Sequence, residues 1–193
     1  MGHRHHPGTF RLAVLAAFSL VAFLPGHSQD KPKPEVIQAS ARGEMRGAGN
    51  FVSITINIES YSTPEDQKTL IDAFQSGGHD ALVDALKKMK SRGRVSITGQ
   101  LGYQIAYIRS FPNQNGRTVR LITDRPVQAG EALNSGRSLN YDLSGIQINL
   151  AKDKKKSEGY LVLAGKFLLD KNNQITFESL GSGPWKLVNI QER

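Results

Sequence analysis

Cysteine is absent from this sequence, and histidine and tryptophan are scarce. A chain without cysteine can form no disulfide, no thiolate zinc site and no Cys-His catalytic pair. Its stability must therefore come from a packed core, and a chain of this length is large enough to bury one.

Histidine is concentrated at the N-terminus, since four of the five histidines lie within the first 28 residues and His79 is the other. Once that segment is removed, a multi-histidine zinc site is excluded, and a Ser-His-Asp triad requires His79. His79 follows Gly77 and Gly78 at a predicted helix start, which favours a capping or solvent-facing side chain. We therefore expect no metal, no cofactor and no catalytic residue of these types.

The first 28 residues have the layout of a secretory signal peptide. Arg4 and Arg11 precede an apolar run over residues 12–24, and a short polar segment ends at Ser28. The apolar run is shorter than the roughly 20 residues that a membrane-spanning helix needs. We expect cleavage after Ser28, a periplasmic or secreted location, and no integral membrane span in the mature chain.

Basic residues outnumber acidic ones, and the formal net charge is +8. Loss of Arg4 and Arg11 with the signal peptide, and of no acid, lowers this charge to +6. A moderate basic excess favours anionic partners. The cations are scattered over predicted loops and turns, and export separates the chain from cytoplasmic DNA and RNA, so we expect no nucleic-acid partner.

Residues 29–34 form a charged, proline-spaced lead that we expect to be extended and flexible. Residues 35–193 have the pattern of a single domain built mainly of strands. The clearest signal covers residues 52–59, where Val and Ile alternate with polar residues at the period of a strand. Other strands are predicted at residues 37–41, 94–98, 103–111, 117–123, 140–150, 160–169, 174–180 and 185–190. Turn signals at residues 113–116, 153–159, 170–173 and 181–184 separate most of them.

One helical region interrupts the strands. Thr63 and Pro64 mark its start, because a threonine hydroxyl caps free N–H groups and proline fits the first turn. Gly77 and Gly78 end a first helix, and a second is predicted to reach Lys90. We therefore predict an α+β fold: a predominantly antiparallel β-sheet, curled into a partial barrel or a sandwich, with an inserted helical hairpin packed on one face.

The longest stretch without periodicity covers residues 124–140, and aperiodic segments of that length in a compact domain are commonly functional. Arginine and tyrosine gather around it, and their side chains suit a carboxylate, a phosphate or a sugar. The candidate ligand-binding residues are Asp124, Arg125, Arg137 and Tyr141, with Arg109 and Tyr107 on a neighbouring predicted strand. A structural role for the same residues, in turns and in the core, is the alternative.

Carboxylate chemistry is the catalytic route that this composition leaves open, since a pair of acids can hydrolyse a glycosidic bond. The acids on predicted strands or at their ends are Glu59, Asp124, Asp142 and Glu178. The sequence does not place any two of them across a cleft.

Three runs carry a resemblance to known sequences: ITGQLGYQIAYIRSFP, GRTVRLITDRPV and RSLNYDLSGIQINL. They resemble a group of exported bacterial proteins with no assigned activity, and the similarity extends over nearly all of the predicted domain. The resemblance implies export and a single domain, and it carries over no ligand, partner or catalytic residue.

These patterns support three hypotheses. The first is a non-enzymatic exported domain that binds an anionic small molecule, a glycan or an envelope protein through residues 124–142 and the adjacent strands. The second is a glycan hydrolase, acting in the cell envelope or outside the cell, that uses a carboxylate pair. The third is an assembly module that pairs with a partner through an exposed sheet edge.

Overall fold

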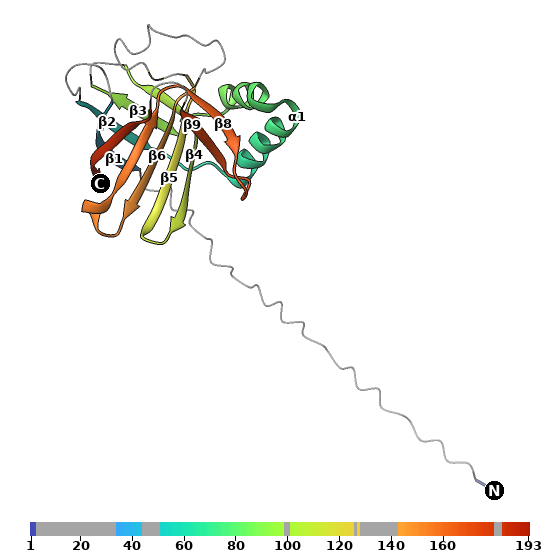
Figure 1. The fold of residues 1–193 in the computed structure, drawn as a ribbon. Helices are drawn as coiled ribbons and strands as arrows, with labels where there is room; N and C mark the ends of the chain where they lie inside the picture. The colour runs from blue at the N-terminus through green and yellow to red at the C-terminus, as the bar shows by residue number, and fades with distance from the viewer. Residues whose placement is uncertain (3–33, 44–50, 99–100, 126, 128–142, 180–182) are drawn as a thin grey trace. The chain divides into compact units, whose positions relative to one another are not determined.

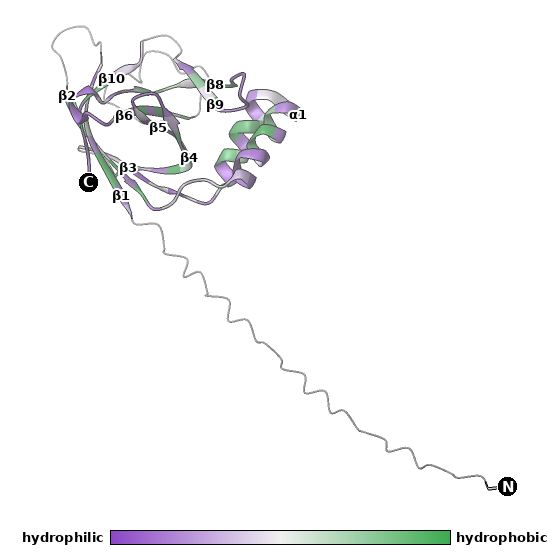
Figure 2. Cartoon of the chain, turned by 90° about the horizontal axis from the view of Figure 1, so that it is seen from below, coloured by the Kyte–Doolittle hydropathy of each residue, from purple (hydrophilic) through white to green (hydrophobic). Residues whose placement is uncertain are grey.

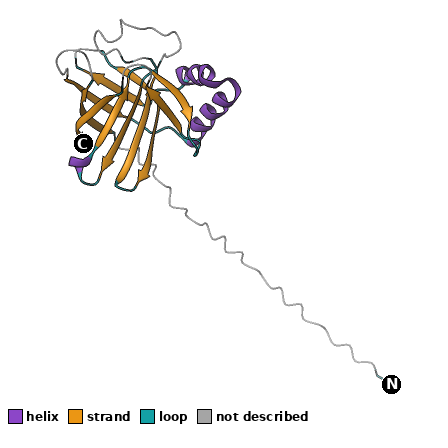
Figure 3. Ribbon diagram, in the orientation of Figure 1, coloured by secondary structure: helices purple, strands orange, loops and turns teal. Residues whose placement is uncertain are grey.

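The computed structural model describes residues 1–2, 34–43, 51–98, 101–125, 127, 143–179 and 183–193. Residues 32–193 form one compact unit, and strands dominate it (Figure 3). Its elements are β1 (Glu35–Arg42), β2 (Phe51–Ile58), α1 (Pro64–Lys88), β3 (Gly93–Ile97), β4 (Tyr103–Asn113), β5 (Gly116–Thr123), β6 (Gly145–Ala151), the 3-10 turn η2 (Lys154–Lys156), β7 (Glu158–Val162), β8 (Gly165–Leu169), β9 (Ile175–Ser179) and β10 (Trp185–Glu192).

Eight antiparallel strands close into a barrel in the order β1-β10-β7-β6-β5-β4-β3-β2. β1 pairs with β2 on one side and with β10 on the other, so the first and last strands complete the ring (Figure 1). The other two strands, β8 and β9, form a separate two-stranded sheet. The predicted α+β fold with a mainly antiparallel sheet is confirmed, and the sheet is a closed barrel.

The barrel interior is filled mainly by aliphatic side chains, to which all eight strands contribute. On β2, Ile54, Ile56 and Ile58 point inward, as the alternation in the sequence predicted. An eight-stranded barrel encloses a space narrow enough for side chains to fill. Each fully buried aliphatic side chain stabilises the fold by roughly 1.5–3 kcal/mol, so this interior is a main source of stability.

A second hydrophobic cluster, which we call the outer cluster, lies outside the barrel and joins it to α1 and to the β8–β9 sheet. Leu82 and Leu86 of α1 pack there with Tyr107 of β4 and Phe167 of β8. Strict alternation would point Tyr107 inward with Ile105, but a shift in the register of β4 between them turns Tyr107 outward. Figure 2 shows α1 outside the ring of strands.

α1 begins where the sequence predicted. The Thr63 hydroxyl accepts the Asp66 N–H at 3.2 Å, and the Asp66 carboxylate accepts the Thr63 N–H at 2.8 Å, which makes a capping box. The backbone leaves helical geometry at Gly77 and Gly78, and the φ of 65° at Gly78 is one that glycine adopts without strain. The helical insertion is present; that its two halves form a hairpin stays a prediction.

The single strand predicted over residues 160–169 is wrong, because the chain forms two strands in different sheets there. β7 ends at Val162 inside the barrel sheet, and β8 begins at Gly165 in the two-stranded sheet. Val162 and Phe167 both pack in the outer cluster, so the apolar run continues across the break. A continuous apolar run does not reveal where a chain changes sheets.

One end of the barrel is closed by an ion cluster, which consists of Glu35, Tyr61, Ser110, Arg117 and Glu192. The Arg117 guanidinium donates to Glu35, to Glu192 at 2.7 Å and to the Tyr61 hydroxyl at 2.8 Å. Tyr61 donates to Glu35 at 2.7 Å. The three charged residues each lie two positions from an inward-facing aliphatic residue of the same strand, so they point across the barrel end.

Candidate functional site

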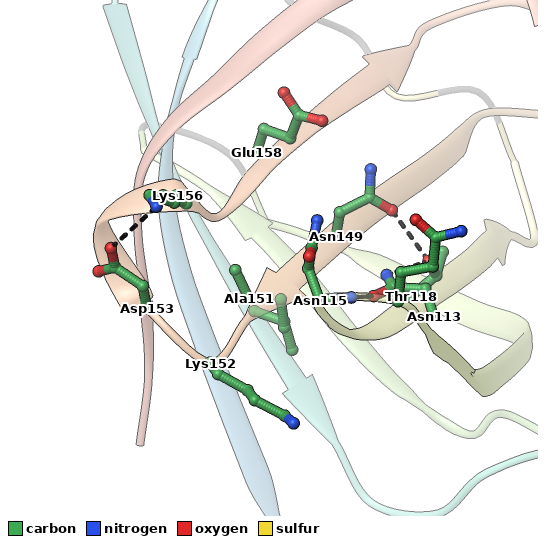
Figure 4. Close-up of a pocket in the computed structure, with 11 residues that line it drawn as sticks. Asn113, Asn115, Thr118, Asn149, Ala151, Lys152, Asp153, Lys156 and Glu158 are labelled. Atoms are coloured by element: carbon green, nitrogen blue, oxygen red, sulfur yellow. Dashed lines mark hydrogen bonds and ion pairs between the residues drawn. The ribbon is translucent and has the colours of Figure 1, made fainter.

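A polar cavity of about 630 Å³ lies where the β4–β5 hairpin meets the end of β6 and η2 (Figure 4). Its lining includes the amide side chains of Asn113, Gln114, Asn115 and Asn149. The hydroxyl of Thr118 lies among them. Amides both donate and accept hydrogen bonds, so this cavity suits a ligand that does the same.

Local turn chemistry positions the hairpin side of the cavity. The Asn113 carboxamide oxygen accepts the Asn115 N–H at 2.9 Å, which is the side-chain turn that asparagine favours. Lys152 N–H donates to the Asn115 carbonyl at 2.9 Å and ties the hairpin to the end of β6. Position 116 requires glycine, because a Cβ there would lie 2.1 Å from the Leu150 carbonyl oxygen.

The Thr118 hydroxyl fixes the orientation of two amides (Figure 4). Asn113 Nδ2 donates to Thr118 Oγ1 at 3.0 Å, and Thr118 Oγ1 donates to Asn149 Oδ1 at 2.9 Å. This leaves the Asn149 NH2 group with no acceptor among the described residues. The cavity therefore has a preoriented amide whose donors are available to a ligand.

Charged groups of both signs stand at the margin of the cavity. Lys152, Lys156, Asp153 and Glu158 line it, and Lys156 Nζ lies 3.8 Å from the Asp153 carboxylate. Asp153 also caps η2, because its Oδ1 accepts the Lys155 N–H at 3.2 Å. Asp153 is thus already engaged by its own turn.

A second cavity, of about 600 Å³, adjoins the polar one and shares Asn149 and Glu158 with it. Its lining adds apolar groups from Tyr160, Pro184 and Val188. Burial raises the pKa of the Tyr160 hydroxyl. A polar subsite beside an apolar wall is the combination that small-molecule sites commonly use for orientation and affinity.

Asp124 and Arg125, two of the six sequence-predicted site residues, lie at the other end of β5 from the polar cavity. The Arg125 guanidinium lies over the Tyr103 ring, 5.3 Å from its centroid, and donates to the Gly102 carbonyl at 3.0 Å. Asp124 Oδ1 is buried and has no hydrogen-bond partner among the described residues.

Two other predicted site residues, Tyr107 and Arg109, lie on β4. The Tyr107 hydroxyl is buried in the outer cluster without a described partner, and burial raises its pKa to about 12. Arg109 donates to the Ser62 carbonyl at 3.4 Å, beside the start of α1. Arg137 and Tyr141 are outside the described residues. None of the four described candidates lines either cavity.

The four acids considered for hydrolysis are on separate elements where they are described. Glu59 follows β2, Asp124 follows β5, Glu178 lies on β9, and Asp142 is outside the described residues. The acids that share a cavity are instead Asp153 and Glu158.

His79, for which a capping or solvent-facing role was predicted, contacts β8. Its ring stacks on Phe167 with centroids 5.8 Å apart, and its Nδ1 accepts the Phe167 N–H at 3.4 Å. His79 therefore joins α1 to β8. Within the described part of the chain, no group of three or more His, Cys, Asp or Glu side chains is placed to hold a metal ion. None of the described helices has both the length and the hydrophobicity that crossing a bilayer requires.

The sequence pattern predicted turns at residues 113–116 and 153–159, and it did not join them into one site. The sequence signal that could have indicated the site is the run of three amide residues at positions 113–115. The partnership between Thr118 and Asn149 depends on the pairing of β5 with β6, in which these two residues are opposite each other. Such a pairing across a long connection has no local signature in the sequence.

Comparison of the chain with protein-family models, with curated proteins and with solved structures finds no match. The chemistry of the cavity therefore carries the functional argument.

Proposed function

We propose that the protein is an exported, non-enzymatic binding domain that holds a glycan in the polar cavity beside Asn149. The observation that carries this proposal is the amide pair fixed by Thr118, with the Asn149 NH2 group left without a described acceptor. Neighbouring hydroxyls of a sugar both donate and accept, and carboxamides match them with one acceptor and two donors each. A preoriented amide binds with little loss of side-chain entropy.

The surroundings of the amides support the same ligand class. The adjoining cavity offers the Tyr160 side chain and Pro184 as an apolar wall for the C–H face of a sugar ring. The margin carries two lysines and two acids, Lys152, Lys156, Asp153 and Glu158, so it can accept either a neutral glycan or one with acidic groups near Lys152. The signal-peptide layout of residues 1–28 supports export, and a periplasmic or secreted domain meets such glycans.

The test is a thermal-shift screen of residues 29–193, which keep the whole compact unit, against neutral and acidic oligosaccharides. A ligand that binds only the folded state raises the melting temperature. Asn149→Asp keeps the oxygen that accepts from Thr118 and removes the NH2 donors, so it should weaken binding about tenfold or more with the fold intact. Asn115→Ala should weaken binding less, and Asn172→Ala, in the exposed β8–β9 turn, is the matched control.

Two results would contradict the proposal. One is a panel of oligosaccharides that leaves the melting temperature unchanged. The other is a shift that survives Asn149→Asp but disappears in Arg125→Gln, because that would move the site to the sequence-predicted segment at residues 124–142.

Hydrolysis of the bound glycan is the second candidate, because Asp153 and Glu158 line the same cavity. Most glycoside hydrolases use a pair of carboxylates. Release of reducing sugar that is lost in Glu158→Gln would establish this activity. Binding without turnover would leave the non-enzymatic function.

A further inference from the structure

The end of the barrel opposite the ion cluster exposes two large hydrophobic side chains. We call this end the rim and define it by Arg42, Phe51, Arg94, Leu101 and Arg125. Phe51 is 59% exposed and Leu101 is 88% exposed. Phe51 begins β2, and Leu101 lies in the turn between β3 and β4, so neighbouring strands bring both to this end.

Three arginines accompany these exposed side chains. The Arg42 guanidinium lies over the Phe51 ring, 5.8 Å from its centroid, and the Arg94 guanidinium donates to the Leu101 carbonyl. Arg125 lies over the ring of a neighbouring tyrosine. None of the three is paired with a carboxylate among the described residues. The rim therefore carries cationic charge that the described protein does not neutralise.

We propose that the rim docks on the surface of an anionic lipid bilayer. Guanidinium groups bind lipid phosphates, while Phe51 and Leu101 enter the boundary between headgroups and acyl chains. Exposed Phe and Leu side chains flanked by basic residues are the composition that binds such interfaces. The proposal goes beyond glycan binding and does not rest on it.

β5 runs from the polar cavity to the rim, so docking through the rim determines where the cavity faces. Gly116 begins β5 beside the cavity, and Asp124 follows its other end near the rim. A protein held by its rim would keep the cavity turned away from the lipid surface.

The first experiment is co-sedimentation of residues 29–193 with vesicles of phosphatidylcholine alone and with vesicles that also contain phosphatidylglycerol. We expect binding to the anionic vesicles that decreases with added salt. Combined Arg42→Gln, Arg94→Gln and Arg125→Gln should weaken it by about fivefold for each arginine. Combined Lys154→Gln, Lys155→Gln and Lys156→Gln remove the same charge from η2 and should leave it nearly unchanged.

A second variant keeps the proposal falsifiable if loss of the arginine hydrogen bonds affects folding. Phe51→Ser with Leu101→Ser changes only exposed side chains, and it should weaken vesicle binding by about tenfold or more with an unchanged melting temperature. Equal binding by this variant and the parent chain would overturn the proposal. Equal weakening in the η2 control would also overturn it, since it would show attraction by net charge alone.

The absence of cysteine allows the bound orientation to be measured directly. An environment-sensitive fluorophore on Leu101→Cys should shift to the blue on anionic vesicles, and the same label on Lys155→Cys should not. Equal shifts at both positions, or no shift at position 101, would overturn docking through the rim.

Discussion

Arginine has different partners at the two ends of the barrel. In the ion cluster, Arg117 binds two carboxylates and the Tyr61 hydroxyl, so its charge is balanced within the protein. At the rim, Arg42 and Arg125 lie over aromatic rings and have no described carboxylate partner. At one end of the barrel, the arginine stabilises the fold by binding carboxylates of the same chain. At the other end, the arginines have no described carboxylate partner and can bind an anionic partner.

The largest loss of stability is expected for Gly116→Ala, at the end of the barrel that carries the ion cluster. A Cβ at Gly116 would lie 2.1 Å from the Leu150 carbonyl oxygen, and a paired backbone group cannot move aside. We expect the free energy of unfolding to fall by about 3 kcal/mol or more, measured by urea denaturation. Gly183→Ala, just before β10, is the control, because a Cβ there would meet nothing within 4 Å and should cost little. An equal loss at Gly183 would contradict a steric cause at Gly116.

Arg117→Met removes the centre of the ion cluster. It leaves Glu35 and Glu192 without their shared cation in a half-buried site, and we expect a loss of about 2–3 kcal/mol in the free energy of unfolding. Lys68→Met is the control, since Lys68 and Asp72 are 75% and 55% exposed and such a pair contributes little. Equal losses in both variants would show that the ion cluster is no more than a surface ion pair.

Two tyrosines provide a smaller and pH-dependent test. Burial raises the pKa of Tyr61 and of Tyr107 to about 12, from an ordinary value of 10.0. The folded state therefore favours the protonated phenols, so their contribution to stability is complete below pH 10.0 and is lost as the pH rises toward about 12. Either Tyr→Phe change should make the alkaline loss of stability less steep.

Near neutral pH the same two substitutions should differ. Tyr61→Phe removes a hydroxyl that donates to Glu35 and accepts from Arg117, and it should cost about 1 kcal/mol. The Tyr107 hydroxyl is buried without a described partner, so Tyr107→Phe should be neutral or stabilising. Destabilisation by Tyr107→Phe, measured by urea denaturation, would mean that its hydroxyl is bonded in solution.

The smallest effect is expected at the rim. Arg42→Gln removes a cation over an exposed ring, and the free energy of unfolding should change by about 0.5 kcal/mol or less. A loss as large as that of Arg117→Met would show that arginines at both ends of the barrel stabilise the fold equally, which would contradict the difference between the two ends.

The predictable parts of the fold are those set by neighbours in sequence. The alternation of Ile54, Ile56 and Ile58 revealed a strand with one buried face, and Thr63 with Pro64 revealed the helix start. Both signals depend on a few consecutive residues. The candidate site was harder to predict from the sequence, because the orientation of Asn149 depends on a hydrogen bond from Thr118 on another strand.

Closure of the barrel was also beyond local reasoning, because the pairing of β1 with β10 joins the two ends of the domain. The face on which Tyr107 lies could not be read from local pattern either, since an irregularity in one strand reverses the face on which later residues lie.

The pairing of the first barrel strand with the last has a consequence for how the molecule forms. Val36 and Arg193 exchange backbone hydrogen bonds of 3.3 and 2.9 Å, so residues from both ends of the domain meet in the same ladder. Contacts between residues so distant in sequence carry a large loop-closure entropy, and chains rich in them fold slowly. The ring can close only when β10 is available to pair with β1, so closure of this barrel is a late step in its folding.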